Sequence, residues 1–169
     1  MEPVHFELKP LSKEAIPAAL ERAVRYRLLN EPSEAESICF DVLRVDPENQ
    51  QASVILLLAL TDQFGGGHAA SVTRAQETLA RLQTPYERAY YAGIIAERRA
   101  KAQLQIGSPA STGAAYEWLC EAMDWYEKAE GMRPEGNDEA LLRWNACARL
   151  IMQNHLSPRP AEQFEPSLE

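Results

Sequence analysis

Small and bulky apolar residues recur at one spacing in two separate parts of the chain. Both sets have relative offsets of 0, 4, 7 and 12: Ala35, Cys39, Val42 and Pro47 in the first, and Ala122, Tyr126, Ala129 and Pro134 in the second. Offsets of 0, 4 and 7 lie on one face of an α-helix, and the proline that follows ends the helix. A turn and another helix-forming run come after each set. The pattern therefore indicates helical hairpins.

Hydrophobic residues at helical spacing continue along most of the chain and predict seven helices. The predicted ranges are 12–29, 33–46, 50–64, 69–83, 85–106, 114–130 and 138–155. The range 50–64 is apolar on nearly all sides, as expected for a helix packed between neighbours. No stretch alternates between apolar and polar residues as a half-buried strand would. The sequence therefore predicts an all-α fold.

Polar residues that can cap helices mark three of the predicted starts. Ser33 and Glu36 have the spacing of a capping box, in which two side chains satisfy free amides at a helix start. Thr84 and Glu87 repeat this spacing before the fifth predicted helix. Asn49 is a favoured cap for the helix that follows it. These three positions are predicted to begin helices.

The chain divides into an N-terminal extension (1–11), a helical domain (12–155) and a tail (156–169). From residue 157 onward three prolines and three glutamates predict a mobile tail. Residues 107–113 are rich in glycine, serine and proline, and we expect them to form a connection between the fifth and sixth helices.

The hairpin pattern resembles the tetratricopeptide repeat (TPR) family, whose unit is a pair of antiparallel helices. Residues 16–49 match best. The small, aromatic and terminal proline positions of the repeat are filled by Ala23, Tyr26, Ala35 and Pro47. Two positions depart from the family pattern, because Ala19 stands where a tryptophan is usual and Arg22 where a leucine is common.

Residues 86–134 resemble a lengthened repeat. Its matching residues are Ala92, Gly93, Ala122, Tyr126, Ala129 and Pro134. The extra length lies around 101–118 and departs from the family's period of about 34 residues. Residues 50–85 resemble a degenerate copy, and the last helix resembles an unpaired half-repeat. The resemblance implies a right-handed α-α superhelix of about seven helices, because stacked hairpins share a core that one hairpin cannot form.

Composition and charge narrow the class of partner. The chain has 169 residues, a formal net charge of -8 and 46% hydrophobic residues, which fits one globular domain. A protein that binds the nucleic-acid backbone needs a stripe of basic residues, and a net charge of -8 argues against one here. The N-terminus lacks the basic start and apolar core of a signal peptide, and the most apolar stretch, 54–60, is too short to span a bilayer. We therefore expect a cytoplasmic protein that binds neither nucleic acid nor membrane.

No residue pattern predicts catalysis, a metal or a cofactor. Cys39, Cys120 and Cys147 form no CxxC pair and lie in apolar helical runs, as buried reduced thiols do. The three histidines are far apart and match no metal-binding motif. The glycines at 65–67 follow a helix and lack the lysine and hydroxyl of a phosphate-binding loop. We therefore expect a protein that is not an enzyme.

TPR proteins usually bind peptides or proteins in a concave groove lined by the first helix of each hairpin. The resemblance implies seven partner-binding residues: Arg27, Gln51, Tyr90, Ile94, Glu97, Arg98 and Arg149. Among them, Tyr90 and Arg98 are expected to be the main anchor and charge contact. Leu20 and Val24 stand where the family's clamp for acidic C-terminal peptides has lysine and asparagine, so this groove is expected to be more apolar. The main hypothesis is a non-catalytic adaptor or scaffold for a peptide or protein.

Two other functions stay open. A self-associating subunit is suggested by Trp125 and by a stripe of small residues: Ala89, Gly93, Ala96 and Ala100. A small-ligand sensor or enzyme would need a pocket that no motif marks. The basic cluster around Arg98, Arg99 and Lys101 is interpreted either as a solvated helix face or as a receptor for a carboxylate or phosphate, since arginine binds such groups through two parallel bonds.

Overall fold

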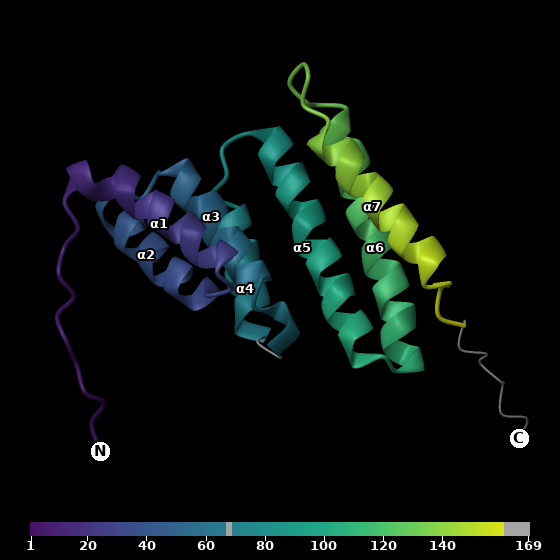
Figure 1. Ribbon diagram of the computed structural model, residues 1–169, viewed down its shortest axis with the longest axis horizontal. Coiled ribbons are helices and arrows are strands. Elements are labelled where there is room, and N and C mark those ends of the chain that lie inside the picture. The colour runs from purple at the N-terminus through teal and green to yellow at the C-terminus, as the bar shows by residue number, and fades with distance from the viewer. Residues whose placement is uncertain (67–68, 161–169) are drawn as a thin grey trace, which may run out of the picture.

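The computed structural model describes residues 1–66 and 69–160, and within them the chain forms seven α-helices and no β-strand (Figure 1). The helices are α1 (Ile16–Leu28), α2 (Pro32–Val45), α3 (Gln50–Thr61), α4 (Ala69–Leu79), α5 (Pro85–Ile106), α6 (Pro109–Glu130) and α7 (Glu139–Gln153). Two short 3-10 helices are η1 (Lys13–Ala15) and η2 (Phe64–Gly66). The all-α prediction is confirmed.

Each helix packs against the helix that follows it in the chain. The helices α1 and α2, α3 and α4, and α5 and α6 fold back on one another as hairpins, and α7 packs on α6 (Figure 1). The hairpins predicted from the two repeated spacings are therefore present. The contact between α4 and α5 is much smaller than that between α5 and α6, so the last three helices adjoin the first four through a limited surface.

Two of the three predicted caps are confirmed. The Asn49 side chain accepts a hydrogen bond from the Ala52 amide at 2.8 Å, and the Thr84 hydroxyl accepts one from the Glu87 amide at 3.1 Å. The predicted cap at Ser33 is wrong. Helix α2 begins one residue earlier, at a proline whose fixed φ suits the first helical turn, so Ser33 lies inside the helix.

The expectation of a long connection at 107–113 is also wrong. Only Gly107 and Ser108 separate α5 from α6. Gly107 ends α5 with a φ of +75°, a conformation that favours glycine. The Ser108 hydroxyl then accepts a hydrogen bond from the Ser111 amide at 3.2 Å and caps α6. The residues assigned to a loop instead lengthen α6 to 22 residues.

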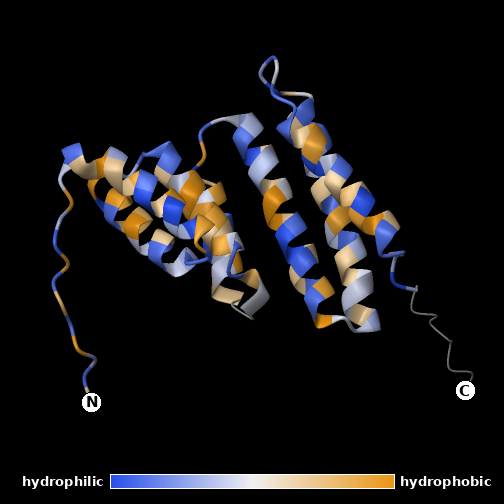
Figure 2. Ribbon diagram, viewed as in Figure 1, coloured by the Kyte–Doolittle hydropathy of each residue, from blue (hydrophilic) through white to orange (hydrophobic). Residues whose placement is uncertain are grey.

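The buried side chains form two hydrophobic cores. The first lies among α1–α4 and also includes Ile95 of α5, the second lies among α5–α7, and the half-buried Tyr91 packs against both. In Figure 2 hydrophobic residues are continuous along much of α3, whereas hydrophilic residues interrupt them in the middle of α5. Cys39 and Cys147 are buried, as predicted, whereas Cys120 is only partly buried. Burial raises the pKa of the Cys39 and Cys147 thiols to about 12.

Residues 1–10 are exposed and lie outside any helix. At the other end, Leu156 packs against the second core, and Arg159 Nε donates to Glu117 Oε1 on α6 at 3.0 Å. Most of the predicted mobile tail, 161–169, lies outside the described residues. Among the described helices, none has both the length and the apolar character needed to cross a membrane.

The stripe of small residues on α5 lies against α6. Ala89, Ala96 and Ala100 are buried in the second core. A Cβ added to Gly93 would stand 2.5 Å from Cε1 of the Tyr126 ring. The two helices are therefore in close contact at this point. Most of the stripe is thus used in packing within this chain.

We predict that Gly93→Ala destabilises the protein by about 2 kcal/mol, because the new methyl group must displace a buried ring. Gly131→Ala is the matched control, since its Cβ would meet no atom closer than 3.6 Å. Its free energy of unfolding should change by less than about 0.5 kcal/mol. Urea denaturation of both variants measures the difference. Equal stability of the two variants would contradict the close approach.

Candidate functional site

Two of the predicted partner-binding residues meet at one carboxylate. Arg27 Nε donates to Asp62 Oδ2 at 2.7 Å, and Arg98 Nη1 lies 3.3 Å from Asp62 Oδ1. Asp62 follows directly after α3, so this ion pair joins α1, α3 and α5. Sequence analysis did not single out Asp62. The only available signal was that Asp62 is the first acidic residue after an almost entirely apolar helix.

The predicted anchor Tyr90 belongs to a cluster of aromatic rings. Its ring centroid lies 6.0 Å from that of Tyr86, 5.0 Å from that of Tyr91 and 5.8 Å from that of Tyr126. Burial is the main cause that raises the pKa of Tyr90. Tyr90 is half-buried and Ile94 is buried. The role of these two residues in binding a partner stays a prediction.

The predicted residue Glu97 lies at the centre of a buried polar cluster that joins three helices. Its side chain is only 2% exposed. Atom Oε1 accepts hydrogen bonds from Arg143 Nε at 3.1 Å, from the Tyr126 hydroxyl at 3.3 Å and from the Cys147 thiol at 3.4 Å. Atom Oε2 accepts from Lys101 Nζ at 3.0 Å and from Arg143 Nη2. We call these five residues the Glu97 cluster.

The charges of the Glu97 cluster hold the carboxylate in its ionised form. Burial by itself raises the pKa of Glu97, but the hydrogen bonds and positive charges of Arg143 and Lys101 outweigh it, so the pKa lies below its ordinary value. For Arg143, burial lowers the pKa, and the hydrogen bond and charge of Glu97 reverse the effect and raise it. The two partners therefore remain a charged pair at neutral pH.

The remaining predicted residues, Gln51 and Arg149, are exposed. Arg149 lies on α7 and lines a pocket that also includes Glu97. The structure therefore brings together two pairs of the seven predicted residues, Arg27 with Arg98 and Glu97 with Arg149. The other three, Gln51, Tyr90 and Ile94, belong to neither pair.

A larger hollow lies on the opposite side of α5. Glu97 and Arg99 are two residues apart, about 200° around a helix, and Arg99 faces this other side. Two adjoining hollows of about 410 and 170 Å³ share several lining residues and together form what we call the α4–α6 groove. Its lining residues are Gln76, Leu79, Ala80, Pro85, Arg88, Ala89, Ala92, Ile95, Ala96, Arg99, Trp118, Glu121, Trp125, Lys128 and Met132.

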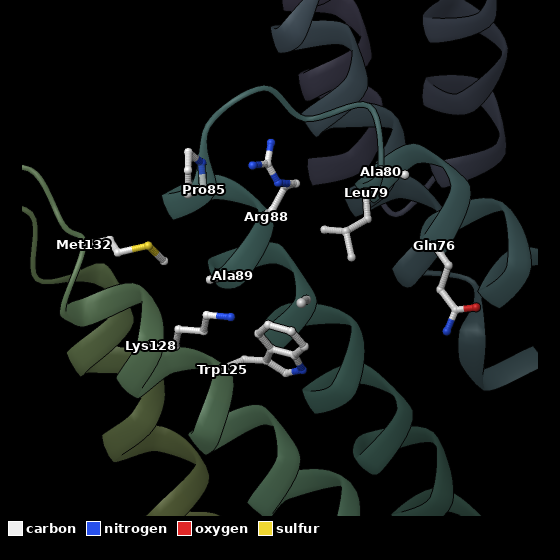
Figure 3. A pocket seen from close by; sticks show the side chains of 10 residues that line it. Gln76, Leu79, Ala80, Pro85, Arg88, Ala89, Trp125, Lys128 and Met132 are labelled. Atoms are coloured by element: carbon white, nitrogen blue, oxygen red, sulfur yellow. The ribbon is translucent and has the colours of Figure 1, made fainter.

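The side chains that line the larger hollow come from α4, α5 and α6 and from the residues just after α4 and α6. Figure 3 shows Leu79 and Gln76 of α4 on one side and Trp125 and Lys128 of α6 on the other, with α5 between them. The half-buried Trp125 turns its ring toward the hollow. The prediction from the sequence that Trp125 is partly exposed is therefore confirmed.

Cations border the groove. The Lys128 ammonium lies 5.2 Å from the centroid of the Trp125 ring, and the Arg99 guanidinium lies 3.8 Å from that of Trp118. Both distances are within the range of cation–π attraction. Arg88 Nη1 donates to the Leu82 carbonyl at 2.7 Å. With three cations and the single acid Glu121, the groove combines apolar walls with an excess of positive charge.

Neither a metal nor a relative identifies the site. In the part of the chain that the structure describes, no three His, Cys, Asp or Glu residues gather closely enough to hold a metal ion. We found no protein-family model, no curated protein and no solved structure that matches the chain. The conclusions on function therefore depend on the geometry alone.

We predict that Glu97→Gln lowers the free energy of unfolding by about 3 kcal/mol at neutral pH, because it leaves Arg143 and Lys101 with an uncharged, imperfect partner. Glu77→Gln, on the exposed surface of α4, is the control and should change stability by less than about 0.5 kcal/mol.

The same variants test the charge state of Glu97. Because its folded-state pKa lies below the ordinary value of 4.5, the unfolded chain binds a proton first as the pH falls. The contribution of Glu97 is therefore present above pH 4.5 and is lost as the pH falls through the folded-state pKa. Urea denaturation across this range should show a smaller acid-induced loss in Glu97→Gln than in Glu77→Gln. Parallel profiles would contradict the charged pair.

Proposed function

We propose that this chain is a non-catalytic interaction module that holds an acidic and apolar segment of a partner protein in the α4–α6 groove. The single observation that supports this proposal is the composition of the groove: apolar walls, a half-buried tryptophan and an excess of cations on a chain whose net charge is -8. Apolar side chains of the partner would enter the hollows and its carboxylates would face the cations.

Binding would bury an aromatic anchor, Trp125, beneath the partner segment, and charged side chains would surround this contact. Tryptophan and arginine are enriched among the residues that dominate interface energies, especially where a side chain fills a pocket. Trp125 and Met132 offer apolar contact, and Lys128 lies beside the same hollow. Complementary charge at the rim would speed association and select acidic segments over basic ones.

We further propose that the hairpins stack as a right-handed superhelix of the TPR type and that the protein acts in the cytoplasm as an adaptor or scaffold. The support for the repeat is the pair of hairpins at 16–49 and 86–134, which carry the matching small and aromatic residues. In such a repeat α1, α3, α5 and α7 would line the concave face, and the α4–α6 groove would open on the other side.

The concave face is the alternative site for the same function. It would include Arg149 and Gln51, which are exposed, and Leu142, which is 61% exposed. Several other residues predicted there are already engaged within the chain, as Arg27 and Arg98 are with Asp62. We therefore favour the groove.

Selection of phage-displayed random peptides on the full chain tests the proposal. We expect the enriched peptides to combine aromatic or aliphatic residues with aspartate or glutamate. Trp125→Ala should weaken their binding at least tenfold, since loss of an aromatic anchor costs about 2 kcal/mol. Lys128→Glu should also weaken binding, and more so at low salt.

Two control variants place matched changes on the predicted concave face. Leu142→Ala removes an exposed apolar side chain, and Arg149→Glu reverses an exposed charge. Both should leave peptide affinity unchanged. If they abolish binding while Trp125→Ala does not, the concave face is the site and the groove assignment is wrong. A dimer seen by light scattering that Trp125→Ala dissociates would replace the proposal with self-association.

A further inference from the structure

A second pocket lies between α5 and α7, on the side of α5 that faces away from the α4–α6 groove. Its volume is about 330 Å³. The pocket is lined by charged residues of both helices, Lys101 from α5 and Arg143 and Arg149 from α7, and the Glu97 carboxylate is buried beside them. We propose that this pocket binds a phosphate group. This proposal is independent of the α4–α6 groove.

The charge balance of the pocket favours a doubly charged anion. Three cations face one carboxylate, which leaves an excess of two positive charges on a chain that is strongly acidic as a whole. Arg149 has no ion-pair partner among residues 1–66 and 69–160. A phosphate monoester carries between about one and a half and two negative charges at neutral pH and would neutralise this excess, whereas one carboxylate would not.

Glu97 prepares the pocket instead of repelling an anion from it. Both of its oxygens are occupied by hydrogen bonds, and its side chain is almost fully buried. Its partners keep further donors. Arg143 donates to Glu97 through Nε and Nη2, so its Nη1 stays available to a ligand. Lys101 donates one of its three ammonium protons to Glu97, so two stay available.

These retained donors are held in place before any ligand arrives. The side chains of Lys101 and Arg143 are 44% and 33% exposed, so solvent or a ligand can reach them. Because Glu97 already restricts both side chains, an anion would lose less conformational entropy on binding than it would among unrestrained surface cations. The pocket is thus prepared for several charge-assisted hydrogen bonds to one group.

The apolar walls of the pocket distinguish between two possible sources of the phosphate group. Ala146 and Leu150 supply apolar surface beside the cations. A phosphorylated side chain of a partner would contact this surface with its carbon atoms, whereas free phosphate would use the cations alone. The two sources share the same anion chemistry and differ in the contribution of these walls.

Titration of the full chain with inorganic phosphate, at a pH high enough for the free anion to be doubly charged, tests the site. The side-chain Nε–H signals of Arg143 and Arg149 in NMR spectra are expected to shift and to saturate. Arg149→Ala should weaken phosphate binding about tenfold or more, which corresponds to the loss of charge-assisted hydrogen bonds. Acetate at matched ionic strength should bind much more weakly.

Arg25→Ala is the matched control, because it removes an equal charge from an exposed position on α1. It should leave phosphate affinity unchanged. Lys101→Gln is a second test and should weaken binding. Non-saturating shifts, equal binding of acetate, or equal effects of Arg149→Ala and Arg25→Ala would each overturn the proposal. Tighter binding of N-acetyl-phosphoserine amide than of phosphate would identify a phosphorylated side chain as the ligand, and equal binding would identify a free phosphate compound.

Discussion

The arrangement of the last three helices depends on the buried carboxylate of Glu97. A carboxylate in this environment is costly unless charges and hydrogen bonds compensate it. Here the compensation comes from α5 through Lys101, from α6 through Tyr126 and from α7 through Arg143 and Cys147. Each helix therefore supplies a group that the carboxylate needs. A shift of α7 along α6 would leave the charge without Arg143, so the cluster selects one register among those that apolar packing would allow.

This constraint also explains how α7 is held in place. Helix α7 packs on α6 with the buried Ala140 and Cys147 and with the partly buried Trp144, Leu150 and Ile151. The bond between Arg143 and Glu97, in which two nitrogens meet two oxygens, adds direction to this apolar surface. It keeps Arg143 beside Arg149 on the wall of the charged pocket.

The sequence predicted what depends on local spacing. The hairpins, the proline stops and the caps at Asn49 and Thr84 follow from residues within a few positions of one another, and the structure contains them. The connection at 107–113 was mispredicted for a related reason. Gly107 and Ser108 are the stop and start signals, but the glycine and serine that follow were counted as loop although a helix tolerates them once it is capped.

The site could be predicted only in part, because its contacts join distant residues. Periodicity assigned Glu97 to a helix face but could not show that α7 covers that face, since Glu97 and Arg143 are 46 positions apart. The same limit applies to Asp62, whose partner Arg27 is 35 positions away. Correlated substitutions among homologous sequences can reveal such pairs, but no short-range pattern in a single sequence connects them. The α4–α6 groove was missed for a different reason, which lies in the lengths of the helices.

The α4–α6 groove exists because a short helix lies against a long hairpin. Helix α4 has 11 residues and α5 has 22, so at 1.5 Å per residue α4 is shorter by about 16 Å. It ends at Leu79, and only a loop runs beside the first turns of α5. Several alanines of α5 are also too small to fill the space that α4 leaves, since Ala89, Ala92 and Ala96 line the hollows.

Small residues thus have opposite effects on two sides of α5. Toward α6 they permit close packing, as at Gly93 and Tyr126. Toward α4 they leave a depression that Trp125 borders but does not fill. A larger side chain at Ala92 would fill the depression. It would not touch the Glu97 cluster, which lies on the other side of the helix. The two surfaces of α5 can therefore be altered separately, and this separation follows from helical geometry alone.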